Sequence, residues 1–225
     1  MDSLRELLEE ELKDIYSAEK QFMAAMPRIA KKVTSEELKT ALQEHMEQTR
    51  GQLERLERVF ESLGKPAKAK TCEAMKGLIK EATEMAGEDG EDAVIDAAII
   101  AAAQKIEHYE IASYGTVRTW ARLVGQNEAA DLLQETLDEE GEADERLNQL
   151  AESFVNPQAE AAEGGDGEMS GGGKSSGGKK SSGKKSSGGK SSGGSKSSGG
   201  KSSGGGKSSS RKSGGKKSGG SKSRR

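Results

Sequence analysis

A long amphipathic segment over residues 95–124 constrains this chain more than any other feature. Its apolar residues, among them Ile99 and Ile106, recur at the spacing of one helix face and should pack against a core. Glu110 lies on that apolar stripe and Glu107 lies beside it. A buried carboxylate without a partner costs several kcal/mol, so these acids must face water, pair with a base or bind a cation.

The composition divides the chain into two parts. All seven aromatic residues come before Pro157, whereas residues 171–225 are almost wholly Gly, Ser, Lys and Arg. A segment without apolar residues cannot bury a core. The sequence therefore predicts one folded domain over residues 1–156 and a disordered tail over residues 157–225.

The charge is divided in the same way. Residues 1–170 contain 19 Lys and Arg against 38 Asp and Glu, and residues 171–225 contain 16 Lys and Arg with no acid. The overall net charge of -3 therefore conceals an acidic body and a basic tail.

Four segments carry the apolar periodicity of long helices. Helices are expected over residues 3–33, 34–63, 91–123 and 128–154, the last ending before Pro157. Residues 64–90 are too many for a tight turn and carry a short amphipathic segment of their own. A long connection of this kind lets the third long helix run parallel to the second. The predicted fold is an all-α, ferritin-like four-helix bundle with a helical crossover.

Each predicted long helix interrupts its apolar stripe near the middle with residues that can bind metal. These residues are Glu19, His45, Glu107 with Glu110, and Glu140 with Asp144. Carboxylates and an imidazole from four facing helices are the ligand set of a dinuclear iron or manganese site. Tyr16, Thr49 and Tyr109 are the expected hydrogen-bond partners of the ligands, with Tyr114 as a further candidate.

A structural explanation of the same residues stays open. Bundle sites of this type use Glu-x-x-His on two helices, but His45 and His108 are the only histidines and neither has Glu three positions before it. The polar residues would then form a layer paired through tyrosine, threonine, lysine or arginine side chains and would set helix register.

Several sequence blocks together resemble a known group. They are residues 14–21 (DIYSAEKQ), His45 with Thr49, residues 71–79 (TCEAMKGLI), residues 107–110 (EHYE) and residues 136–144. The chain is similar to the ferritin-like superfamily, specifically to the YciE/YciF branch of bacterial stress proteins. The resemblance covers nearly all of residues 1–154 and implies a ferritin-like bundle, a homodimer and a dinuclear metal centre linked to osmotic or oxidative stress.

The tail repeats Lys-Ser-Ser-Gly-Gly with variations and offers cations without aromatic residues. Binding to nucleic acid would therefore depend on phosphate contacts and not on base sequence. The candidate contacts are Lys174, Lys179, Lys180, Lys184, Lys185, Arg211, Lys212, Lys216, Lys217, Arg224 and Arg225. Contact with the acidic body, or no specific role, are the alternatives for the tail.

The remaining expectations concern location and partners. The longest apolar run, residues 97–103, falls short of the ~20 residues that span a bilayer, so no membrane contact is expected. No secretion signal is visible and the single cysteine suits a reducing compartment, which predicts a cytoplasmic protein without a small organic cofactor. The alternative function is a non-enzymatic, DNA-associated or structural dimeric module without metal.

Overall fold

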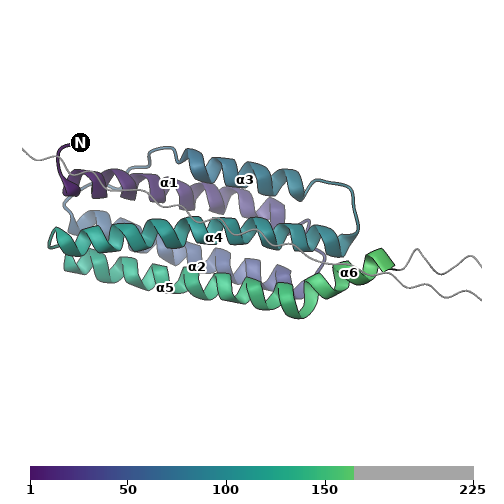
Figure 1. The fold of residues 1–225 in the computed structure, drawn as a ribbon. Helices are drawn as coiled ribbons and strands as arrows, with labels where there is room; N and C mark the ends of the chain where they lie inside the picture. Colours follow the sequence, from purple (N-terminus) through teal and green to yellow (C-terminus); the bar gives the residue numbers. More distant parts are fainter. Residues whose placement is uncertain (165–225) are drawn as a thin grey trace, which may run out of the picture. The chain divides into compact units, whose positions relative to one another are not determined.

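The computed structural model describes residues 1–164, and within them the chain is helical with no strand (Figure 1). The elements are α1 (Leu4–Ala30), α2 (Glu36–Ser62), α3 (Glu73–Met85), α4 (Asp92–Leu123), α5 (Asn127–Leu150), the π-helical segment η1 (Ala151–Val155) and α6 (Asn156–Gly164). The predicted all-α class is therefore confirmed. The predicted tail disorder and nucleic-acid contacts of residues 165–225 lie outside the described residues.

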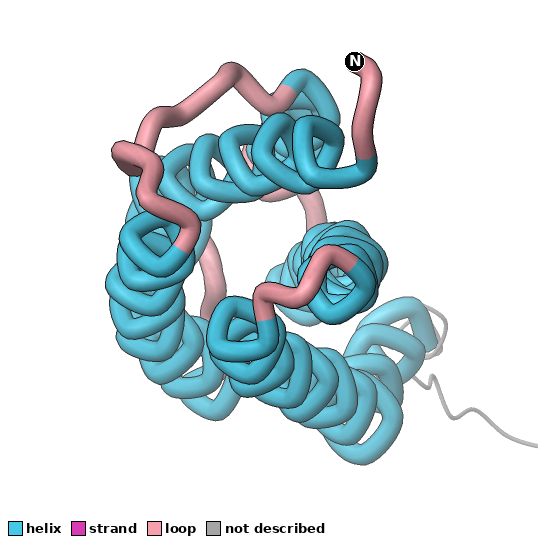
Figure 2. Tube along the Cα trace, turned by 90° about the vertical axis from the view of Figure 1, so that its left-hand side faces the viewer, coloured by secondary structure: helices cyan, strands magenta, loops and turns pink. Residues whose placement is uncertain are grey.

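Helices α1, α2, α4 and α5 form the four-helix bundle. Helix α1 packs against α2 and α4, and α5 packs against the same two helices. Helix α3 lies outside the bundle against α1 and α4, as the end-on view also shows (Figure 2). Because α3 carries the chain back along the bundle, α4 runs parallel to α2 (Figure 1). The predicted crossover topology is confirmed.

Short polar side chains and glycines set the helix ends. The hydroxyls of Ser3 and Ser35 accept backbone N–H bonds at 3.1 and 3.2 Å and cap the starts of α1 and α2. Gly64 follows α2 with φ 67° and Gly125 follows α4 with φ 79°. This left-handed conformation is costly for residues with a Cβ, so glycine ends both helices.

The apolar core has two halves with a polar layer between them. One half is built around Phe22, Met26 and Ile99, and the other around Leu8 and Tyr114. Along each bundle helix, the residues of one half precede those of the other. The buried carboxylate and histidine residues at or next to this change are Glu19, His45, Glu107, Glu110 and Glu140, whereas the buried Asp96 lies near the start of α4. The polar layer therefore lies midway along the bundle.

The prediction that the last helix ends before Pro157 is wrong. The helix passes through η1, where the Asn156 N–H donates to the Ala151 carbonyl five residues back, and continues as α6 to Gly164. Proline is tolerated in the first turn of a helix because its missing N–H has no partner there. The wider π-helical turn precedes such a new start. The domain boundary at residue 156 stays a prediction.

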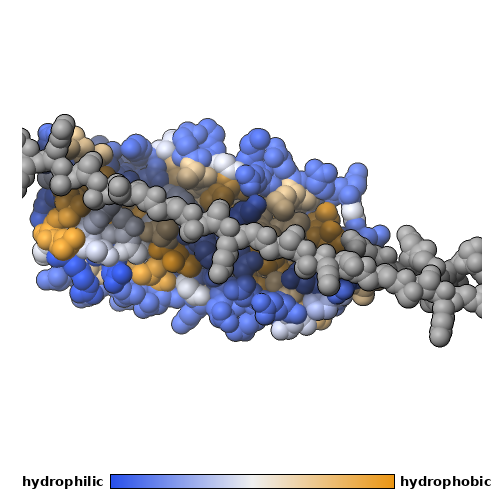
Figure 3. All heavy atoms as spheres, viewed as in Figure 1, coloured by the Kyte–Doolittle hydropathy of each residue, from blue (hydrophilic) through white to orange (hydrophobic). Residues whose placement is uncertain are grey.

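The outer surface of the bundle is mostly hydrophilic on the face that Figure 3 shows, with hydrophobic residues visible between the hydrophilic ones. This pattern is typical of amphipathic helices that turn their apolar stripes inward. None of the described helices combines enough length with enough apolar character to cross a bilayer.

Candidate metal centre

Four buried side chains from three helices meet in the polar layer. His45 on α2, Glu107 and Glu110 on α4, and Glu140 on α5 each present a ligand atom, and these atoms all lie within 4.8 Å of one another. The three glutamates are at most 1% exposed and His45 is 6% exposed. We call these four residues the His–Glu cluster.

Six of the eight polar side-chain atoms of the His–Glu cluster lack a hydrogen-bond partner among the described residues. Both ring nitrogens of His45, both carboxylate oxygens of Glu140 and one oxygen each of Glu107 and Glu110 are buried without a hydrogen bond. His45 Nε2 lies 3.3 Å from Glu107 Oε1 and 3.8 Å from Glu140 Oε2, within ion-pair range. Since buried polar atoms are normally hydrogen-bonded, this set calls for a partner from outside the protein.

Glu19 on α1 lies beside the His–Glu cluster and is 1% exposed. Its Oε1 accepts a 2.6 Å hydrogen bond from the Tyr114 hydroxyl. Burial raises the pKa of Glu19 to about 7, against the opposing effects of the Tyr114 hydrogen bond and the His45 charge. Together with the His–Glu cluster, Glu19 gives the layer four carboxyl groups, and all four bundle helices contribute to it.

Burial and mutual repulsion favour protons on these carboxyl groups. Burial, followed by the charge of Glu19, raises the pKa of Glu110 and of Glu140 well above the usual value. Burial is the strongest single influence on His45 and lowers its pKa, but the charge and hydrogen bonding of Glu107 and the charge of Glu19 together outweigh it, so the pKa is raised. A divalent cation bound here would displace these protons, because metal ligands must be deprotonated.

Comparisons with known proteins agree with this architecture. Residues 3–160 match the sequence profile of a family described as a domain of unknown function, DUF892. The chain belongs to this family. It is 49% identical over 150 residues to Protein YciF of Escherichia coli (strain K12), an alignment that covers 66% of this chain and 90% of YciF. The resemblance to the YciE/YciF branch is therefore confirmed.

Solved structures of similar proteins share the fold. The crystal structure of the E. coli stress protein YciF matches with a TM-score of 0.67 and 46% identity, over 69% of this chain and 99% of that one. YcfI from Rhodopseudomonas palustris matches with a TM-score of 0.64 and 44% identity, over 65% and 94% of the two chains. A Xanthomonas campestris protein matches with a TM-score of 0.56 and 26% identity, over 71% and 98%.

In this DUF892 chain, Asp144 lies apart from the residues with which the sequence grouped it. It is not part of the His–Glu cluster, and its Oδ1 lies 3.3 Å from Nδ1 of the exposed His108. Asp144 shares a helix face with Glu140, but four residues of helix carry it about 6 Å farther along the axis. A shared face therefore does not bring both carboxylates to one point.

The three expected hydrogen-bond partners of the ligands have other partners. The Tyr16 hydroxyl donates to Glu57 at 2.7 Å, and the Tyr109 hydroxyl donates to Asp14 at 2.9 Å. The Thr49 hydroxyl donates to the backbone carbonyl of His45 at 2.9 Å and does not reach its ring. Tyr114 is the tyrosine that contacts a carboxylate of the polar layer.

Sequence reasoning missed an ion pair next to the His–Glu cluster. Arg55 on α2 donates to both carboxylate oxygens of Glu139 on α5, at 3.0 and 2.6 Å, and to the Thr136 hydroxyl at 2.7 Å. Glu139 also accepts from Gln52 at 3.1 Å. One hint of this ion pair was present in the sequence, because Arg55 directly precedes Leu56, which lies on the apolar stripe of its helix. Glu139 therefore has hydrogen-bond partners within the protein, whereas the neighbouring Glu140 has none among the described residues.

Proposed function

We propose that this DUF892 protein is a cytoplasmic stress-protection protein that binds two iron or manganese ions at the His–Glu cluster and Glu19 for the reduction of hydrogen peroxide or dioxygen. The observation that carries the proposal is that four buried residues each place one ligand atom within 4.8 Å of the others. Most polar atoms of these residues also lack a hydrogen-bond partner among the described residues. The similarity to E. coli YciF, which is described as a stress protein, supports the setting.

The donor set suits hard divalent cations. Four carboxylates, from Glu19, Glu107, Glu110 and Glu140, neutralise two dications, so the loaded layer carries no net charge in the core. Oxygen donors with one imidazole favour iron and manganese over softer metals. Two ferrous ions bound here would supply the two electrons that, with two protons, convert one hydrogen peroxide into two water molecules.

The protein's own residues would order this site and exclude water from it. The Tyr114 hydroxyl holds one oxygen of Glu19 and leaves the other free to bind metal. The two apolar halves of the core close the layer from both ends of the bundle. In the metal-free protein, Glu19 with its pKa of about 7 can hold a proton near neutral pH, and a bound cation would displace that proton.

Metal analysis of matched variants tests the proposal. Protein purified without oxygen and incubated with ferrous or manganous ions should contain about two ions per chain by elemental analysis. Glu140→Gln removes a buried ligand and should lose this metal, whereas Glu142→Gln makes the same change at an exposed site on α5 and should keep it. Metal-free wild-type protein, or equal metal in both variants, would refute the site.

We also propose that the basic tail holds the bundle, as a homodimer, on nucleic acid. The support is the sequence, with 16 Lys and Arg and no acid in residues 171–225. Deleting these residues should abolish a mobility shift of duplex DNA, and the shift of the full chain should weaken steeply with salt. Binding that survives the deletion would assign it to the bundle. Sedimentation of the deleted protein tests the dimer separately.

A further inference from the structure

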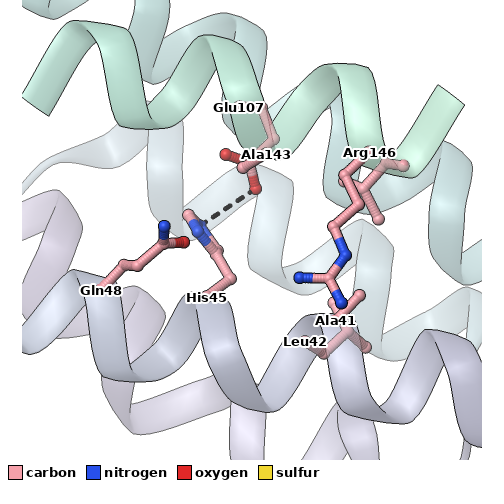
Figure 4. Close-up of a pocket in the computed structure, with 8 residues that line it drawn as sticks. Ala41, Leu42, His45, Gln48, Glu107, Ala143 and Arg146 are labelled. Atoms are coloured by element: carbon pink, nitrogen blue, oxygen red, sulfur yellow. Dashed lines mark ion pairs between the residues drawn. The ribbon is translucent and has the colours of Figure 1, made fainter. Parts of the chain in front are cut away.

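A pocket opens between α2 and α5 and leads to the His–Glu cluster (Figure 4). The space that the centre of a water-sized molecule can occupy in it is about 20 Å³, which is room for about one small molecule. The lining residues are Ala41, Leu42, His45, Gln48, Glu107, Ala143, Arg146 and Leu147. The pocket therefore connects the buried polar layer with the surface.

The lining of the pocket combines exposed polar, small and ligand-bearing side chains. Gln48 and Arg146 are exposed and form its mouth. The small side chains of Ala41 and Ala143 face the pocket from the two helices and leave it open. His45 and Glu107 lie inside, linked as an ion pair in Figure 4. His45 is also the most exposed member of the His–Glu cluster, at 6%.

The chemistry of the pocket selects the molecules that can use it. Leu42 and Leu147 give it apolar walls that do not replace the water around an ion. Glu107 gives its inner end negative charge, which repels anions. At the mouth, Arg146 pairs with Glu44, so its charge is balanced locally. Small uncharged molecules meet none of these barriers.

We propose that this pocket admits small, uncharged molecules of the class of dioxygen and hydrogen peroxide to the His45 side of the His–Glu cluster. The opening exists because both helices place alanine at this level, and a larger side chain at either position would fill it. The use of the path rests on the proposed function, but the path itself is a property of the metal-free protein. It therefore has a test that needs no metal.

Dissolved dioxygen is a suitable probe because it is paramagnetic and uncharged. In metal-free full-length protein under oxygen pressure, NMR relaxation of the His45 ring protons and of the Leu42 and Leu147 methyl groups should be enhanced. The enhancement should be several-fold larger than at the methyl groups of Leu8 and Leu12, which are also buried but do not line the pocket.

Ala143→Leu should reduce the enhancement at His45 several-fold by filling the opening. Ala98→Leu is the matched control, because Ala98 is a half-buried helical alanine that does not line the pocket, and it should leave the enhancement unchanged. Ala143→Val provides a milder block if leucine disturbs folding, which urea unfolding reports.

Equal relaxation at His45, Leu8 and Leu12 in wild-type protein would overturn the path. An Ala143→Val variant that folds and keeps the full enhancement at His45 would overturn it as well. Elemental analysis of the same wild-type protein decides the metal proposal independently, so the two failures are distinguishable. Enhanced relaxation in a protein that binds no metal would leave a gas-accessible pocket without the proposed chemistry.

Discussion

Asp96 and Glu140 are both buried carboxylates of this bundle, at 2% and 0% exposure, but their surroundings differ. Asp96 on α4 accepts the Thr34 N–H at 2.9 Å, the Thr34 hydroxyl at 2.8 Å and the Ser35 N–H at 2.7 Å. Neither oxygen of Glu140 has a hydrogen-bond partner among the described residues. Asp96 is therefore held by the connection between α1 and α2, and Glu140 is not held by the protein.

This difference separates polar groups for which the chain supplies hydrogen-bond partners from those for which the described residues supply none. Where a carboxylate stabilises the bundle, the chain supplies its partners, as it does for the buried Asp96 and as Arg55 does for the half-buried Glu139. A polar layer that only set helix register would be expected to satisfy its own members. The unpartnered atoms of the His–Glu cluster favour metal binding over that structural explanation.

The largest loss of stability from a single substitution is expected at Asp96. Asp96→Ala leaves two backbone N–H groups and a hydroxyl without their acceptor, and it should lower the free energy of unfolding by about 3 kcal/mol. Urea unfolding of the metal-free protein measures this loss.

Glu140→Gln is the contrasting change in the same assay. It removes a buried carboxylate that has no hydrogen bond to lose and only a 3.8 Å ion-pair contact with His45. It should therefore cost far less than Asp96→Ala or stabilise the metal-free protein. Equal losses for the two variants would mean that both carboxylates serve the fold.

Metal should provide the partner that the protein lacks. If the ions bind only the folded state, a free metal concentration about a hundred times Kd should raise the free energy of unfolding by about 2.7 kcal/mol for each bound ion. Unfolding with and without manganous ions measures the gain. Glu142→Gln should show the same gain and Glu140→Gln none. A gain that persists in Glu140→Gln would place the metal elsewhere.

A smaller effect follows from pH. The pKa values of Glu19, Glu110 and Glu140 are raised in the folded protein, Glu19 to about 7. A raised carboxyl pKa stabilises the fold below its ordinary value of 4.5, and this contribution is lost as pH rises through the folded value. The free energy of unfolding of the metal-free wild-type protein should therefore fall between about pH 5 and about pH 8. The fall should be larger than in the Glu110→Gln variant, which lacks one of these carboxyl groups.

Metal affinity should change in the opposite direction over the same range. The protons that stabilise the metal-free layer compete with the cations, so affinity should rise with pH. Calorimetric titration at several pH values measures it. A metal affinity that does not change with pH would contradict the raised pKa values. The same fall in stability with pH in the wild type and in Glu110→Gln would contradict them independently.

Much of the fold follows from helical periodicity. The four stripes predicted the bundle, and the length of the connection after Gly64 predicted the crossover, because both depend on spacing along the chain. The interrupted stripes also named the residues that form the His–Glu cluster. The axial position of Asp144 was not predictable in this way, because periodicity gives the face of a helix but not its sliding against a neighbour.

Hydrogen-bond partners were the least predictable part. Tyr16 and Tyr109 lie near the site in sequence but bond to Glu57 and Asp14, because side-chain direction depends on the packing of three helices at once. The helix beyond Pro157 was missed because proline usually ends a helical pattern, and the π-helical turn before it has no sequence signature.

Tyr114 gives the smallest expected effect and tests the hydrogen bond that its hydroxyl donates to Glu19 at the edge of the polar layer. Tyr114→Phe removes only the hydroxyl that donates to Glu19 and should cost about 1 kcal/mol of unfolding free energy. Because that hydrogen bond lowers the pKa of Glu19, its loss should move the pKa above about 7, as carbon-detected NMR of the carboxyl group reports. Tyr16→Phe, which removes a hydroxyl bonded to Glu57, should leave it unchanged. An equal response in both variants would show that Tyr114 does not act on Glu19 through this bond.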